Sequence, residues 1–133
     1  MATIMPKESK KKILVIEDEL PLLKILVSEL SLEGFQVFSA GDGQEGLKLA
    51  VAKKPDLILL DLIMPKIDGM TMLKKLREDE WGKDASVLIL TNLEGDTQKT
   101  LEALQSGVFE FMVKSRWQLE DVKKRVKEKL SVV

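Results

Sequence analysis

The chain of 133 residues contains no cysteine and no histidine. Without cysteine it can form no disulfide bond, zinc–thiolate site or thiol nucleophile. Without histidine it lacks the usual general base and the commonest ligand of transition metals. Any chemistry must therefore rely on carboxylates, lysine, hydroxyl groups and a hard cation.

Long apolar runs and a strong net charge are also missing. No apolar stretch approaches the ~20 residues that a membrane-spanning helix needs, and the N-terminus lacks the apolar region of a signal peptide. The formal net charge of −1 gives no support for nucleic-acid binding. Three lysines at 10–12 are more typical of a solvated tail than of a binding patch. We therefore expect a cytoplasmic protein that binds neither membrane nor nucleic acid directly.

The length fits one domain. Residues 1–10 are polar, contain Pro6 and show no periodicity, which indicates a flexible N-terminal tail. Residues 11–133 are expected to form a single folded domain, with no room for a separate output domain.

Strand and helix signals alternate along this domain. Short apolar runs predict strands at Ile13–Ile16, Phe35–Ser39, Leu57–Leu60, Val87–Leu90 and Phe109–Val113. Helices between and after them are indicated by apolar residues at helical spacing: Leu22, Leu26 and Leu30; Leu47, Ala50 and Val51; Met72, Leu73 and Leu76; Leu101–Leu104; Val122, Val126 and Leu130. The alternation predicts an α/β fold, a five-stranded parallel sheet with helices on both faces.

The third apolar run, Leu57–Leu60, ends on Asp61. A short continuous run of this kind is typical of a strand that is buried on both faces. Because a charged side chain is costly inside such a strand, Asp61 should lie where the strand leaves the core. In open α/β sheets the carboxyl ends of the strands are where ligands bind. The pattern therefore predicts that Asp61 is the chemical centre of the chain.

Three more acidic residues, Glu17, Asp18 and Glu19, follow the first strand. Alone they are equally typical of a solvated first helical turn, which the helix dipole favours. If the first and third strands are neighbours, however, three carboxylates share one site there, and like charges ~4 Å apart repel by about 1 kcal/mol in water. A hard divalent cation relieves that repulsion, and ligands that are all oxygen favour Mg²⁺. The cation would also neutralise an incoming phosphoryl group beside Asp61.

The fourth and fifth strands end near Thr91 and Lys114. Each residue alone is typical of an ordinary strand end. At the same edge as the carboxylates, however, a hydroxyl and a mobile cation suit contacts with phosphoryl oxygens. Four of the five expected strands thus end in a residue that suits phosphoryl transfer.

These motifs resemble the receiver domain of two-component response regulators. The resemblance rests on the stretch from Ile13 to Glu19, on Asp61 to Gly69 with Met64-Pro65 inside it, and on Leu90-Thr91 and Val113-Lys114. It covers about residues 11–130. It implies a flavodoxin-like fold in which Asp61 accepts a phosphoryl group from a phosphohistidine of a histidine kinase. The absence of histidine from this chain fits a donor that is supplied by another protein.

The resemblance also assigns residue roles. Asp18, Asp61 and the backbone carbonyl of Ile63 would bind Mg²⁺, and Glu17 would help through water. Thr91 and Lys114 would contact the phosphoryl oxygens, and these residues with Asp61 would carry the reaction. In a separate role, Thr91 and the aromatic Phe111 would move together as a switch.

The resemblance therefore implies a phosphoacceptor switch that assists its own phosphorylation and dephosphorylation but is not otherwise an enzyme. Its upstream partner would be a histidine kinase or a phosphotransfer protein. Phosphorylation would reshape the surface of the fourth helix, fifth strand and last helix for an unknown downstream protein. We expect a monomer or a weak homodimer through the same surface. Because Ile63 and Leu93 are apolar at the positions that flank the site, we predict a long-lived aspartyl phosphate.

Four other functions are open. A receiver-like interaction module that works without phosphorylation is disfavoured, because the positions of the motif are all filled. A flavin site needs a glycine- and hydroxyl-rich loop after the first strand, where this chain has acids that would repel phosphate. A phosphatase with an aspartate nucleophile normally has a second aspartate two residues later, where Ile63 stands. A DNA-binding regulator needs a further helical domain with a basic face.

Overall fold

The computed structural model describes residues 10–61, 69–91, 105, 110–113 and 119–130. Strands are β1 Lys12–Ile16, β2 Gln36–Ala40, β3 Leu57–Leu60, β4 Val87–Thr91 and β5 Glu110–Val113. Helices are α1 Leu20–Leu32, α2 Gly43–Lys53, α3 Gly69–Glu78 and α5 Leu119–Leu130, with a short 3₁₀ helix, η1, at Gly82–Asp84. The predicted N-terminal tail, apart from Lys10, and the predicted helix at Leu101–Leu104 lie outside the described residues.

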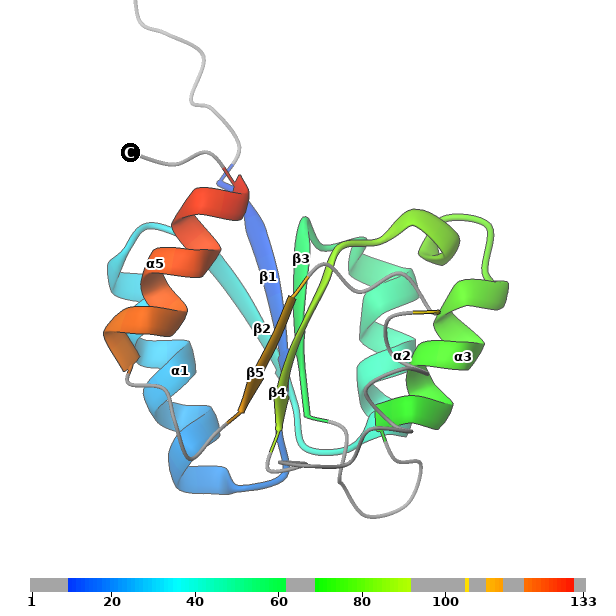
Figure 1. The fold of residues 1–133 in the computed structure, drawn as a ribbon, viewed down its shortest axis with the longest axis horizontal. Helices are drawn as coiled ribbons and strands as arrows, with labels where there is room; N and C mark the ends of the chain where they lie inside the picture. Colours follow the sequence, from blue (N-terminus) through cyan, green and yellow to red (C-terminus); the bar gives the residue numbers. More distant parts are fainter. Residues whose placement is uncertain (1–9, 62–68, 92–104, 106–109, 114–118, 131–133) are drawn as a thin grey trace, which may run out of the picture.

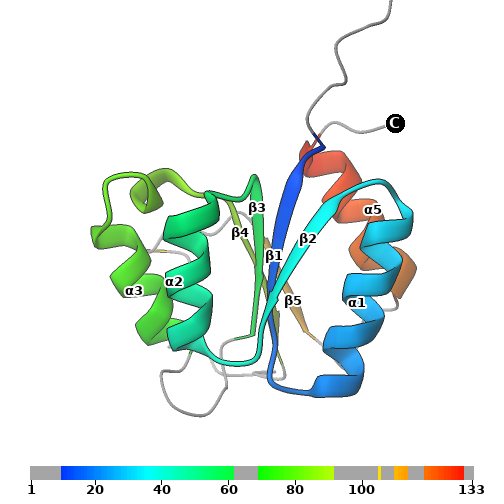
Figure 2. The ribbon, with the colours of Figure 1, turned by 180° about the vertical axis from the view of Figure 1, so that it is seen from behind.

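The strands form one parallel sheet in the order β2-β1-β3-β4-β5. Helices α1 and α5 cover one face of this sheet, and α2 and α3 cover the other (Figures 1 and 2). The predicted α/β architecture, a parallel sheet between two layers of helices, is confirmed. β1 and β3 are hydrogen-bonded neighbours, with Ile16 opposite Leu60. The carboxyl ends of these two strands therefore meet at the same edge.

The core consists of two apolar layers, one on each face of the sheet. Alternate residues of β1 point to opposite layers, so that Leu14 and Ile16 pack in the layer under α2 and α3, and Ile13 and Val15 in the layer under α1 and α5. All four residues of β3 are fully buried, as the continuous apolar run predicted. This burial fixes the strand that ends on Asp61.

The structure corrects one residue of the predicted helix faces, Val51 of α2. In α1 the buried residues are Leu23, Leu26 and Leu30, and Leu22 is half-buried at the edge of the core. In α2 Ala50 is buried and Leu47 packs against the core, but Val51 is exposed. Val51 follows the buried Ala50 directly, so it lies at the edge of the buried face of α2.

Helix α2 lies close to the end of β1. A Cβ atom on Gly46 would come within 2.5 Å of Ile16 Cδ1, so glycine permits this approach. The helix ends at Lys53, because Pro55 disfavours helical backbone angles at Lys54, which adopts a left-handed conformation with φ 48°. Ile16, the residue directly before the acidic residues, therefore packs closely against α2.

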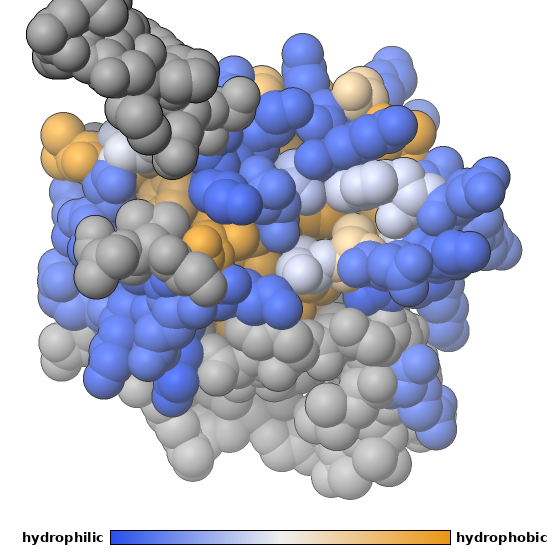
Figure 3. Space-filling view, turned by 90° about the horizontal axis from the view of Figure 1, so that it is seen from above, coloured by the Kyte–Doolittle hydropathy of each residue, from blue (hydrophilic) through white to orange (hydrophobic). Residues whose placement is uncertain are grey.

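Among the described residues, no helix is long and apolar enough to cross a membrane. Figure 3 shows the end of the molecule at the amino ends of the strands, where most of the coloured side chains are hydrophilic.

Candidate functional site

Three carboxylates meet at the carboxyl ends of β1 and β3. Glu17 and Asp18 follow β1 and Asp61 follows β3, and one oxygen from each lies within 4.8 Å of the others. The ladder between the strands continues to this point, because the backbone N–H of Asp61 donates to the carbonyl of Ile16 at 3.1 Å. The expected convergence of the two strand ends on a shared acidic site is therefore present.

The three carboxylates differ in burial. Glu17 and Asp61 are only 2% and 4% exposed, whereas Asp18 is exposed to solvent. Burying ionised carboxylates is costly unless they are paired or coordinate a metal, and their mutual repulsion adds to this cost. A bound cation would offset this cost, and Asp18 is the member of the cluster that solvent reaches.

The backbone holds Glu17 in place. Its N–H donates to the carbonyl of Ala40 in β2 at 3.0 Å, and its carboxylate oxygen Oε2 accepts the N–H of Glu19 at 3.0 Å. The second bond fixes the turn between β1 and α1. It was not predicted, because no sequence pattern indicates a carboxylate that bonds to the backbone two residues later.

The donor set fits a hard divalent cation. All three side chains offer oxygen, and carboxylate oxygens are the ligands that Mg²⁺ prefers. No further acidic residue of the described part joins the cluster. The predicted carbonyl ligand, Ile63, lies outside the described residues, as does the predicted lysine, Lys114.

The backbone places two other predicted residues. Thr91 is the last residue of β4 and pairs with Val113 of β5, and Phe111 pairs with Ile89. Leu60 lies opposite Ile89, so Thr91 reaches the same edge of the sheet as Asp61. The positions of Thr91 and Phe111 along the sheet agree with the predicted roles, which the backbone alone does not test.

Fold and site together define a class: a doubly wound parallel α/β domain with a cluster of three carboxylates at the carboxyl edge of its sheet. Residues 13–127 match the family model of the response regulator receiver domain, and the chain belongs to this family. The resemblance stated from the motifs is thereby confirmed. The family match leaves the predicted domain boundary at residue 11 untested.

Similar proteins support the assignment. The chain is 41% identical over 117 residues to the DNA-binding dual master transcriptional regulator RpaA of Synechocystis sp., an alignment that covers 87% of this chain and 47% of that protein. It is 31% identical to the response regulator TrrA of Thermotoga maritima, solved in complex with Mg²⁺ and BeF, with a TM-score of 0.77 over 90% of this chain and 98% of that one. The chemotaxis protein CheY4 of Vibrio cholerae is 27% identical, with a TM-score of 0.82 over 90% and 98%.

The two kinds of relative differ in length. The chain spans less than half the length of the first curated relatives it matches. It covers almost all of the solved receiver domains. The likeness therefore concerns the receiver domain, and the activities of the longer relatives do not transfer with it.

Proposed function

We propose that this chain is a phosphoacceptor switch of a two-component phosphorelay. Asp61 accepts a phosphoryl group from the phosphohistidine of a histidine kinase or phosphotransfer protein, in a reaction that requires Mg²⁺. The observation that carries the proposal is the cluster of Asp61 with Glu17 and Asp18 within 4.8 Å, at the carboxyl edge of a receiver sheet. The likeness to a receiver solved with Mg²⁺ and BeF supports it.

The reaction forms one bond and breaks another. A carboxylate oxygen of Asp61 bonds to phosphorus while the N–P bond of the donor breaks, and its electron pair stays on the donor's imidazole nitrogen. Asp18, Asp61 and the carbonyl of Ile63 would hold the metal, with Glu17 acting through water. When bound, Mg²⁺ would offset the negative charge that the phosphoryl group brings to the acidic cluster.

The remaining residues act on the product. Thr91 and Lys114 contact the phosphoryl oxygens, and Phe111 moves with Thr91. The change reaches the surface formed by the predicted helix at Leu101–Leu104, β5 and α5, which binds a downstream protein or a second copy of the chain. The protein assists its own phosphorylation and dephosphorylation and acts on no other substrate. We place the protein in the cytoplasm, which agrees with a histidine kinase as the phosphoryl donor.

Intact-mass spectrometry tests the proposal. Incubation with acetyl phosphate and Mg²⁺ is expected to add the mass of one phosphoryl group, and the same incubation with an excess of metal chelator is expected to add none. An adduct that forms equally well in chelator, or no adduct in Mg²⁺, would contradict the proposal. The second outcome would favour the interaction module that works without phosphorylation.

The lifetime of the aspartyl phosphate gives a separate prediction. Ile63 and Leu93, which lie outside the described residues, are apolar and are expected to keep attacking water away. Loss of radiolabelled phosphate from the isolated protein should therefore be slow, and Ile63→Asn should accelerate it by admitting a polar group. A half-life of seconds in the unchanged protein would refute this prediction.

A further inference from the structure

Helix α5 contributes few buried apolar residues to the described part of the domain. Of its residues only Val122 and Val126 are fully buried, while Leu119 and Leu130 lie at the edge of the core. Every other residue of the helix is charged. Because apolar burial is the main favourable term in packing, this thin strip leaves α5 weakly held compared with the strands of the core.

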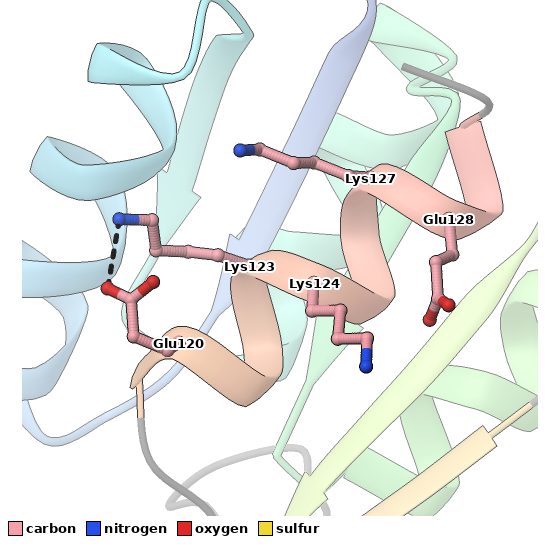
Figure 4. Close-up of a pocket in the computed structure, with 5 residues that line it drawn as sticks. All are labelled: Glu120, Lys123, Lys124, Lys127 and Glu128. Carbon is pink, nitrogen blue, oxygen red and sulfur yellow. Dashed lines mark hydrogen bonds and ion pairs between the residues drawn. The ribbon is translucent and has the colours of Figure 1, made fainter. Parts of the chain in front are cut away.

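Charge supplements this strip on the side that faces α1. The ammonium group of Lys123 lies 3.2 Å from a carboxylate oxygen of Glu29, 3.4 Å from one of Glu33 and 3.2 Å from one of Glu120. Lys127 pairs with Glu33 as well. Figure 4 shows that Lys123 and Lys127 both extend toward α1, whereas Lys124 extends away from it. We call the five residues Glu29, Glu33, Glu120, Lys123 and Lys127 the α1–α5 ion cluster.

The cluster differs from an ordinary surface ion pair. The side chain of Lys123 is only 13% exposed, and its ammonium group is shared by three carboxylates. Hydrogen bonds to Glu29 and then Glu120 raise the pKa of Lys123, and the hydrogen bond from Lys127 lowers the pKa of Glu33. Both lysines also lie near the C-terminus of α1, where the helix dipole favours cations. Networks of this kind hold more firmly than isolated exposed pairs.

We propose that the α1–α5 ion cluster is an ionic latch that sets how readily α5 opens from the sheet while the rest of the domain stays folded. The inference rests on the proposed function, because α5 belongs to the surface that we expect phosphorylation to reshape. The latch would set the free energy of that reshaping. It would respond to ionic strength and to any modification that removes the charge of Lys127 or Glu33.

Hydrogen exchange of the unphosphorylated full chain, followed by mass spectrometry, tests the latch. Raising NaCl from ~0.01 M to ~1 M shortens the screening length from about 30 Å to about 3 Å. We expect exchange of the α5 amides to accelerate roughly three- to tenfold, with β1 and β3 unchanged as internal references. Lys123→Met keeps the aliphatic stem and removes the charge, so α5 should then exchange fast at both salt concentrations.

Lys124→Met is the matched control, since it makes the same change on the same helix at an exposed lysine outside the cluster. It should leave both exchange and its salt dependence as they are. Lys127→Met removes the other lysine that pairs with Glu33, and it should also accelerate exchange of the α5 amides and weaken their salt dependence. The latch is refuted if neither salt nor Lys123→Met changes the exchange rate of the α5 amides. It is also refuted if Lys124→Met accelerates this exchange as much as Lys123→Met does. The readout needs no phosphate, so this result is independent of whether Asp61 forms an adduct.

Discussion

Asp61→Asn is expected to abolish the phosphoryl adduct and, at the same time, to stabilise the metal-free protein. The amide cannot attack phosphorus as a carboxylate does, so intact-mass spectrometry with acetyl phosphate and Mg²⁺ should show no added mass. The change also removes one of three negative charges that lie within 4.8 Å of one another. Function and stability should therefore move in opposite directions.

The size of the stability gain follows from the repulsion that is removed. Two like charges at ~4 Å repel by about 1 kcal/mol in water, and by more where water is partly excluded. Because Asp61 and Glu17 are buried, we expect Asp61→Asn to raise the free energy of unfolding by about 1 kcal/mol or more in chelator. Thermal unfolding in chelator measures the stability gain of the variant, and thermal unfolding in Mg²⁺ measures the stabilisation by the metal. Mg²⁺ should raise the midpoint of the unchanged protein clearly more than that of the variant.

Asp84→Asn is the control for this experiment. It makes the same isosteric change at an exposed aspartate of η1, which precedes β4 and lies at the opposite end of the sheet from Asp61. It should preserve the adduct and the stabilisation by Mg²⁺. An Asp61→Asn protein that still gains a phosphoryl group would show that another residue is the acceptor. Lower stability of that variant in chelator would show that repulsion does not govern the cluster.

Leu26→Ala, on the buried face of α1, should be strongly destabilising. Leu26 is completely buried among residues of β1, β3 and α5, so truncation leaves a cavity as well as losing apolar burial. Such changes cost about 2–5 kcal/mol, a large part of the stability of a typical domain. Urea denaturation followed by circular dichroism should show a markedly lower midpoint with a similar slope.

The same helix supplies the matched comparison. Leu32→Ala makes the same chemical change in the last turn of α1, where the side chain is 77% exposed. It should alter the free energy of unfolding by no more than about 0.5 kcal/mol. Equal effects at Leu26 and Leu32 would mean that α1 does not pack on the sheet as described.

Local pattern was enough to predict much of this protein. The apolar run of β3 was predicted to be buried on both faces and is, since a parallel strand between two helix layers has no solvent face. The inner face of α3, with Met72, Leu73 and Leu76, was also correct. Val51 was wrongly assigned to the inner face of α2, because it lies at the edge of that face, where periodicity does not decide burial.

The site was predictable only in part. Asp61 followed from a charge placed directly after a buried run, and the absence of histidine and cysteine limited the cation to one that binds oxygen. The sequence order alone does not place Glu17 and Asp18 beside Asp61. That proximity depends on the pairing of β1 with β3, in which Ile13 lies opposite Leu57, 44 positions later in the chain.

The sequence by itself thus determined the α/β alternation, the buried strands and the kinds of ligand atom, because these depend on local periodicity and composition. Tertiary structure decided the strand order that assembles the acidic cluster, and it joined Lys123 to Glu29 across 94 positions of the chain. Contacts of this kind form only when the whole core packs, since closing such long loops is favourable only once many side chains are buried together.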